Sequence, residues 1–187
     1  MAVTRLDPVS ALIVIDLQKG IGAMVAPAIL AALVERSRAL AEAFRARGLP
    51  VVLVNVDALA PGRIEAERRA GNFPPEFVEL LEELGAQPGD IRVTKRTWGV
   101  FASTDLGTRL TALGVTQVVV TGVSTSAGVE STARQAYESG YNVTVAIDAV
   151  ADLSDEAHHH SIGHVFPRLG ETGTTDEIIA LLGKRDG

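Results

Sequence analysis

The chain has 187 residues, of which 47% are hydrophobic and 21% are charged. It carries 17 basic and 23 acidic residues, and the resulting formal net charge of −6 argues against a nucleic-acid-binding protein, which usually has a basic face. It has no cysteine, which excludes disulfide bonds, a zinc site with thiolate ligands and chemistry that needs a thiol nucleophile.

Apolar runs typical of buried strands alternate along the chain with segments at helical spacing. Residues 11–15 form a continuous apolar run that ends at Asp16, as expected for a parallel strand buried on both faces. Pro27 suits the first turn of a helix, which Gly48 can close in the left-handed conformation. Residues 51–56 predict the second strand.

The same cycle continues to the end of the chain. The last helix begins at Thr174, where Glu177 completes a capping box. Between the strand over residues 51–56 and this last helix, the pattern predicts the following elements in order: a helix over residues 77–84 stopped by Gly85, a strand over 91–95, a helix over 106–113, a strand over 117–121, a helix over 129–139, a strand over 143–148, a helix from 154 to about 166, and a weak strand over 169–173.

Strands that alternate with helices predict a three-layer α/β/α, Rossmann-like domain with a six-stranded, mainly parallel sheet. We expect the strand order 3-2-1-4-5-6, and a single domain over residues 1–187. Ligands of such sheets bind beyond the carboxyl ends of the strands. The positions to inspect are therefore Asp16, Asp57, residues 95–101, residues 121–128 and Asp148.

The sequence contains no evident targeting or membrane-spanning segment. Residues 1–5 lack the basic patch and apolar run of a signal peptide. The longest apolar stretch, residues 20–34, is too short to span a bilayer and contains Pro27. We therefore expect a soluble, cytoplasmic protein that binds neither membrane nor nucleic acid.

Two residues of opposite charge follow predicted strands. Asp16 ends the first strand and Lys95 ends the third, so both lie at the carboxyl edge of the sheet. Taken alone, Asp16 is interpreted as a loop cap and Lys95, beside Arg96, as a solvated lysine. Together they offer a carboxylate and an ammonium that can hold an acid or base in a tuned state.

A turn of small residues follows the fourth predicted strand. Residues 121–134 pass from strand to helix, and backbone N–H groups at a helix amino terminus favour negative charge. Such a turn can stabilise an oxyanion or bind a substrate carboxylate. The spacing of Gly122 and Gly128 does not match the dinucleotide fingerprint or a phosphate-binding P-loop, and we expect no cofactor.

Three blocks of the sequence resemble the signature blocks of the isochorismatase-like hydrolases, also called the cysteine hydrolases. They are residues 13–18 (IVIDLQ), 93–95 (VTK) and 121–134 (TGVSTSAGVESTAR), and the resemblance extends from about residue 5 to residue 182. The superfamily includes nicotinamidases, N-carbamoylsarcosine amidohydrolases and isochorismatases. The resemblance implies that Asp16 and Lys95 are the catalytic aspartate and lysine.

The resemblance also implies the roles of the small-residue turn. The Val123–Ser124 peptide bond corresponds to one that is usually cis, and the N–H groups of Ser124 and Gly128 would form the oxyanion hole. Gly128 occupies the position of the nucleophilic cysteine. Ser126 and Ser131 lie nearby, but a helix turns about 100° per residue, so their side chains should leave on other faces. A serine amidase is therefore the least favoured of our hypotheses.

Isochorismatases resemble this pattern with a glycine at the nucleophile position. This resemblance implies that Asp16 would protonate a vinyl ether as general acid. Lys95 would position Asp16 and balance the negative charge of the substrate carboxylate, and Gly128 would leave room for the substrate. We therefore expect a hydrolase that acts on a small, anionic substrate. The alternative is a catalytically inactive ligand-binding relative that lost the cysteine.

Two departures from the isochorismatases indicate a more apolar pocket. Val56 stands where they have a glutamine, and Ile21 stands where many relatives have an aromatic residue. We expect these two residues and Val123 to contact substrate. Trp98 and Phe101 would supply an aromatic wall, although a role in the core or in a dimer interface is equally open for each.

The candidate metal ligands are Asp57 and the histidines. Asp57 follows the second strand, but no histidine occurs before residue 158, and His158, His159 and His160 point about 100° apart on a predicted helix. This run is best interpreted as a solvated helix face, with no metal site. Glu130 and Arg134 are likewise interpreted as a surface pair, and the family resemblance implies a homo-oligomer, either a dimer or a tetramer.

Overall fold

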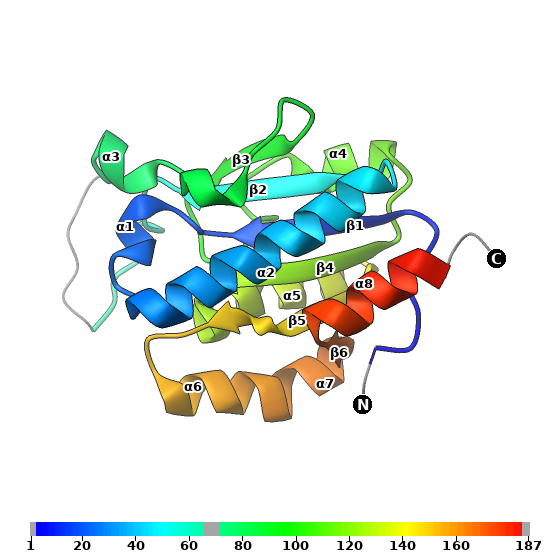
Figure 1. Cartoon of the computed structure of the whole chain (residues 1–187). Helices are drawn as coiled ribbons and strands as arrows, with labels where there is room; N and C mark the ends of the chain where they lie inside the picture. Colours follow the sequence, from blue (N-terminus) through cyan, green and yellow to red (C-terminus); the bar gives the residue numbers. More distant parts are fainter. Residues whose placement is uncertain (1–2, 66–71, 185–187) are drawn as a thin grey trace.

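Six parallel strands form one sheet in the order β3-β2-β1-β4-β5-β6. The computed structural model describes residues 3–65 and 72–184 (Figure 1). The predicted α/β architecture and strand order are confirmed, whereas the predicted single domain begins and ends outside the described residues and stays a prediction. The strands are β1 (Ser10–Ile15), β2 (Val51–Val56), β3 (Ile91–Lys95), β4 (Gln117–Val123), β5 (Asn142–Ala151) and β6 (Glu171–Gly173).

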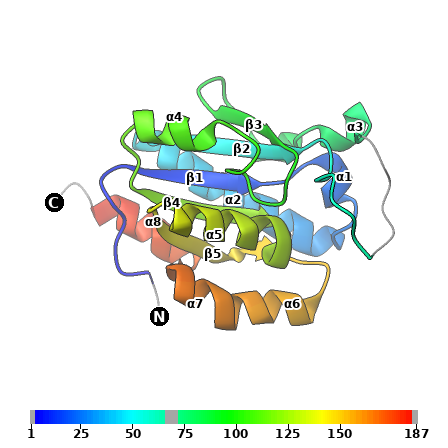
Figure 2. The same ribbon diagram turned by 180° about the vertical axis from the view of Figure 1, so that it is seen from behind.

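Helices cover both faces of this sheet. One face carries α2 (Pro27–Ala46) and α8 (Thr175–Gly183), and the opposite face carries α4 (Leu106–Ala112) and α5 (Glu130–Glu138) (Figures 1 and 2). Among the described residues, none of the helices has the length and apolar character that crossing a membrane requires. The described residues also form four short α-helices: α1 (Lys19–Gly22), α3 (Pro75–Val78), α6 (Asp155–His160) and α7 (Phe166–Leu169).

Burial on both faces explains the apolar sequence of the central strand β1. All six of its residues are buried. Leu12 and Val14 belong to the core that includes residues of α2 and α8, whereas Ala11, Ile13 and Ile15 belong to the core that includes residues of α4 and α5. Because successive side chains point to opposite faces and both faces are covered, apolar residues fill positions 11–15 of the strand, and Ser10 at its start is the one polar residue.

Helix α2 begins and ends where the sequence predicts. Pro27 is its first residue, and Gly48 follows with a positive φ of 65°. The buried stripe contains one polar residue, Ser37, whose hydroxyl lies 3.3 Å from that of Thr121. At its amino terminus, α8 has the predicted capping box between Thr174 and Glu177.

The predicted helix over residues 77–84 is wrong. Helix α3 ends at Val78, and the chain then runs extended until a single 3₁₀ turn at Glu82–Leu84. Leu80 forms an antiparallel bridge with Gln18, and the N–H of Leu81 donates to the carbonyl of Leu17 at 3.0 Å. These hydrogen bonds to the segment after β1 replace the helical ones, so the apolar spacing reflects packing rather than helix formation.

Several other elements run beyond their predicted ends. Strand β4 continues to Val123 and β5 to Ala151, with a shift in their pairing between Val120 and Gly122. A π-helical turn at Thr125–Val129 precedes α5. Helical structure also continues past Pro167 as α7, because a proline in the first turn of a helical segment loses no hydrogen bond.

Gly122 pairs with Ile15 of β1, and this close approach generates a prediction about stability. Gly122 has a φ of 118°, and a Cβ atom there would overlap the carbonyl oxygen of Ile15. We expect Gly122→Ala to lower the free energy of unfolding by about 3 kcal/mol or more, from backbone strain and steric overlap together. Urea unfolding would measure the change.

Gly114→Ala is the matched control for this substitution. Gly114 has a φ of 69°, but open space surrounds its Cβ position, so it reports the cost of the conformation alone, about 1 kcal/mol. Equal losses in the two variants would contradict a role for close packing of β4 on β1.

Candidate active site

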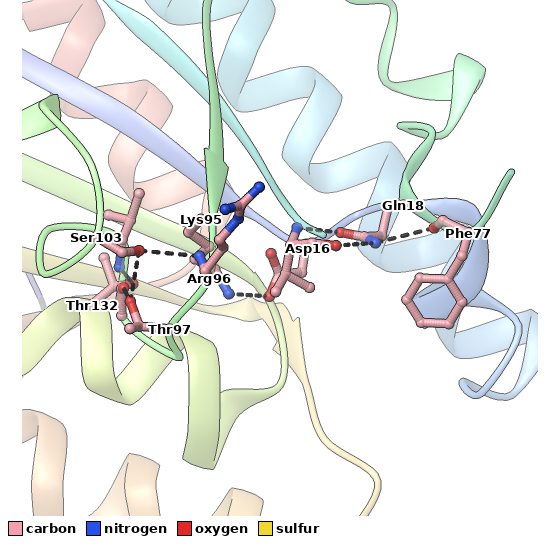
Figure 3. Close-up of polar contacts among 11 residues, drawn as sticks. Asp16, Gln18, Phe77, Lys95, Arg96, Thr97, Ser103 and Thr132 are labelled. Atoms are coloured by element: carbon pink, nitrogen blue, oxygen red, sulfur yellow. Dashed lines mark hydrogen bonds and ion pairs between the residues drawn. The ribbon is translucent and has the colours of Figure 1, made fainter. Parts of the chain in front are cut away.

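A buried ion pair joins the ends of β1 and β3. Lys95 Nζ lies 2.7 Å from Asp16 Oδ2, and the two side chains are only 2% and 8% exposed (Figure 3). The structure thus brings together the two residues that the sequence placed at the carboxyl edge of the sheet. Lys95 is not the solvated lysine that it would be if taken alone.

Burial and the lysine act on Asp16 in opposite directions. Loss of solvent raises the pKa of the Asp16 carboxyl to about 6, although the positive charge and the hydrogen bond of Lys95 lower it. The second carboxyl oxygen, Oδ1, is buried and has no hydrogen-bond partner among the described residues. Asp16 therefore has one oxygen bound by Lys95 and one without a partner among the described residues, with a pKa suited to proton transfer near neutral pH.

The backbone at Asp16 turns the chain out of the strand. Its φ is 53°, in the left-handed region that aspartate adopts more readily than most residues. Its N–H still donates to Val54 of β2 at 2.9 Å, and its carbonyl accepts from the N–H of Gln18 at 2.9 Å. The carboxyl is therefore positioned by hydrogen bonds on both sides of its own residue.

Gln18 supports the site, and the sequence analysis did not identify this role. Its side chain is fully buried, accepts from the N–H of Val56 at 2.7 Å and donates to the carbonyl of Val56 at 3.1 Å. The same amide donates to the carbonyl of Phe77 at 3.1 Å (Figure 3). Gln18 thus satisfies the backbone at the end of β2, the strand between Asp16 and Lys95. The feature of the sequence that could have indicated this role is a glutamine two residues after Asp16, at the end of an otherwise apolar segment.

The turn of small residues faces the ion pair through Gly128. The Val123–Ser124 peptide bond is cis, as the resemblance implies. The carbonyl of Ser124 accepts from the N–H groups of Ala127 and Val129 at 3.1 and 3.0 Å, which closes the turn. A Cβ atom at Gly128 would lie 3.3 Å from Asp16 Oδ2. A side chain at position 128 would therefore enter the space beside the carboxyl.

Ser126 is bound on another side of the same turn. Its N–H and its hydroxyl both donate to Asp152 Oδ2, at 2.7 and 2.8 Å. Partial burial opposes ionisation of Asp152, but the hydrogen bonds from Ser126 and from the N–H groups of Leu153 and Ser154 outweigh it and lower the pKa. The Ser126 hydroxyl is therefore directed to an ionised carboxylate near α6 and not to the Asp16–Lys95 pair.

Hydrogen bonds from α5 hold the segment after β3. The side chain of Thr132 accepts from the N–H of Val100, and that of Gln135 accepts from the N–H groups of Phe101 and Ala102. Arg96 turns outward and forms a two-fold ion pair with Asp57 at 3.0 and 3.1 Å. Figure 3 shows Arg96, with Ser103 and Thr97 beside it.

The residues expected to contact substrate lie in different surroundings. Trp98 is 62% exposed, whereas Phe101 stacks on Tyr141 with ring centres 5.8 Å apart, which favours a core role for Phe101. Ile21 is partly buried against the core under α2. Val56 and Val123 are both buried, so their side chains belong to the protein interior.

The histidine run does not form a uniformly solvated face, which corrects that expectation for His158. The Nδ1 of His158 lies 2.8 Å from the hydroxyl of Thr125, and the side chain is partly buried. Nδ1 of His159 lies 2.6 Å from the carbonyl of Asp155, and the rings of His160 and His164 are 5.3 Å apart. Within residues 3–65 and 72–184, no three His, Asp or Glu side chains are grouped so that they could hold a metal ion.

Two further predicted positions have structural partners. Asp148 accepts from the N–H and hydroxyl of Thr175 at the start of α8, at 2.8 and 3.0 Å. Glu130 pairs with Arg134 as predicted, at 2.9 Å, but it also accepts from the hydroxyl of Ser161 at 2.6 Å. These contacts hold helices rather than a ligand.

Comparisons with known proteins agree on one family. Residues 10–177 match the family described as the isochorismatase domain. The uncharacterized isochorismatase family protein YecD of Escherichia coli O157:H7 is 40% identical over 181 residues, covering 92% of this chain and 96% of that protein. An isochorismatase family protein from Burkholderia thailandensis has a structure with a TM-score of 0.92 and 39% identity, covering 96% of this chain and 98% of that one.

A more distant relative matches over part of its length. The phenazine biosynthesis protein PhzD of Pseudomonas fluorescens is 33% identical over 105 residues, which cover 56% of this chain and 51% of that protein.

The raised pKa of Asp16 predicts how stability depends on pH. Its folded pKa of about 6 exceeds the ordinary 3.8, so the proton on Asp16 favours the folded state. This stabilisation is complete below pH 3.8 and is lost as the pH rises through 6, and it amounts to about 3 kcal/mol. Asp16→Asn keeps a hydrogen-bonding side chain but cannot titrate.

Urea unfolding of both proteins between pH 3.5 and 7.5 would test this prediction. We expect the free energy of unfolding of the wild type, relative to Asp16→Asn, to fall by about 3 kcal/mol across that range. A constant difference between the two proteins would mean that burial does not perturb Asp16.

Proposed function

The chain belongs to the isochorismatase family, and from this premise we propose that it is a hydrolase that cleaves a small, anionic vinyl ether without a covalent intermediate. The observation that carries the proposal is the Asp16 carboxyl, which is buried, bound by Lys95 through one oxygen and unpartnered at the other. The proposed partner is this small molecule, and we further propose that the protein acts in the cytoplasm as a dimer or tetramer.

In the proposed reaction Asp16 is the general acid. The protonated carboxyl donates its proton to the terminal carbon of the vinyl ether, and an oxocarbenium ion forms at the neighbouring carbon. Water adds to this carbon and returns a proton to Asp16. The resulting hemiketal breaks into a ketone and an alcohol, so that one vinyl ether and one water give two products and the acid is regenerated.

Lys95 and the turn at 124–128 have electrostatic roles in this mechanism. The Lys95 ammonium holds Asp16 in place and stabilises the carboxylate that remains after proton transfer. We propose the N–H groups of Ser124 and Gly128 as donors to the anionic group of the substrate. The N–H groups of Ser126, Ala127 and Val129 already have acceptors within the protein.

Gly128 supports a reaction that needs no enzyme nucleophile. A Cβ atom at position 128 would lie 3.0 Å from Ile15 Cγ2 and 3.3 Å from Asp16 Oδ2, so the glycine keeps side-chain atoms away from the carboxyl. Since the sequence has no cysteine and Ser126 is bound by Asp152, a covalent acyl-enzyme has no evident nucleophile at the turn.

The alternative function is ligand binding without catalysis. Val56 pairs with Lys95 in the sheet and Ile21 packs against the apolar core, and these apolar residues, where relatives have a glutamine and an aromatic residue, favour this alternative. A panel of vinyl ethers, amides and ureides distinguishes the two functions. Turnover that Lys95→Ala abolishes would exclude the binding-only alternative.

Isochorismate is the first substrate to test, with released pyruvate as the readout. We expect Asp16→Asn to lower kcat/KM by about 10²- to 10⁴-fold, because the proton donor is lost. We expect kcat/KM of the wild type to fall as the pH rises above about 6, because Asp16 loses its proton there.

Asp57→Asn is the matched control, since Asp57 follows the neighbouring strand and pairs outward with Arg96. It should retain nearly full activity. Full turnover by Asp16→Asn would refute acid catalysis by this residue, whereas turnover of no compound in the panel would favour the ligand-binding alternative.

A further inference from the structure

Two side chains from the segment after β5 hold the turn at 124–128 from the side of α6. Asp152 accepts both the N–H and the hydroxyl of Ser126, at 2.7 and 2.8 Å. His158 Nδ1 lies 2.8 Å from the hydroxyl of Thr125. Two consecutive residues of the turn are thus anchored by side chains that are distant from them in sequence.

Loss of the contact between Thr125 and His158 would leave a buried hydroxyl unpaired and destabilise the turn. Thr125 is completely buried, so its hydroxyl needs a protein partner. The charged and titratable groups that act on His158 are His159, Asp152 and Asp155. Burial and His159 lower the pKa of His158, and the two carboxylates oppose them without reversing the shift. The imidazole is therefore neutral at pH 7, and with its proton on Nε2 it accepts the Thr125 hydroxyl at Nδ1.

The anchored residues stand between the two N–H groups assigned to the anion. Ser124 precedes Thr125, and Gly128 follows Ser126 by two residues. The internal hydrogen bonds of the turn run from Ala127 and Val129 to the Ser124 carbonyl and fix its curvature. The bonds to Asp152 and His158 fix its orientation relative to β5 and α6, and hence relative to Asp16.

We propose that His158 and Asp152 are positioning residues that orient the turn at 124–128 so that its N–H groups face the anionic group of the substrate. The inference rests on the proposed function for its effect on catalysis. Neither residue contacts the reacting atoms; each acts through Thr125 or Ser126. A displacement of about 1 Å in such donors lowers the rate about 100-fold.

Kinetics of matched variants test the His158 anchor. We expect His158→Leu to lower kcat/KM for isochorismate about 10- to 100-fold, with most of the loss in kcat. His158→Asn restores an acceptor near the position of Nδ1 and should stay within about threefold of wild type. Thr125→Val should cost as much as His158→Leu, and the double variant should cost no more than either. Loss of activity in His158→Asn equal to that in His158→Leu, or additive losses in the double variant, would overturn the proposal.

His160→Leu is the control on the same helix, since His160 is exposed and its ring lies beside that of His164, with the ring centres 5.3 Å apart, rather than beside His158. It should leave kcat/KM unchanged. An effect as large as that of His158→Leu would assign the loss to α6 in general and overturn the proposal.

Amide hydrogen exchange tests the same inference without any substrate. In His158→Leu and Asp152→Ala we expect the amides of Ala127 and Val129 to exchange about tenfold faster, while the amide of Ile13 in β1 keeps its wild-type rate. Unchanged exchange at the turn, or acceleration at Ile13 as large as at the turn, would overturn the positioning role. If no substrate is found, the proposed function fails but this measurement still decides the inference.

Discussion

The site depends on one interaction, the burial of Asp16 beside Lys95. In water such a pair would be fully ionised and would contribute little. At the dry end of the sheet, burial favours the neutral acid and the lysine favours the carboxylate, and the pKa of about 6 is the balance between them. Either effect alone would fix Asp16 in one protonation state. The two together allow a carboxyl group to gain and lose a proton near neutral pH.

The strand order determines which residue types can form this pair. β1 and β3 lie on either side of β2, so the ends of the two strands are separated by about 10 Å at the usual strand spacing. Asp16 has a short side chain, and the long side chain of Lys95 spans most of the distance. The end of β2 lies between them, and Gln18 satisfies both polar backbone groups of Val56 there. This glutamine therefore leaves neither the N–H nor the carbonyl of Val56 unpaired at the floor of the site.

The sequence predicts the sheet and the catalytic pair because both depend on local patterns. Apolar runs mark the four central strands β1, β2, β4 and β5, and the parallel-sheet rule brings Asp16 and Lys95 to one edge. The helix expected over residues 77–84 is wrong because hydrogen bonds to residues 17 and 18, distant in sequence, override local spacing. The partners of His158 and Asp152 were missed for the same reason, since periodicity along α6 carries no information on which residue of another turn it contacts.

Gly128 also has a consequence for the chemical durability of the protein. A reactive thiolate can be alkylated or oxidised through sulfenic to irreversible sulfinic and sulfonic acids. Here the residues around the carboxyl are an aspartate, a lysine and a glycine, and the chain of 187 residues has no thiol. Peroxide and thiol-alkylating reagents therefore have no thiol to attack in this chain, and Asp16 and Lys95 have no side chain that peroxide converts to such acids.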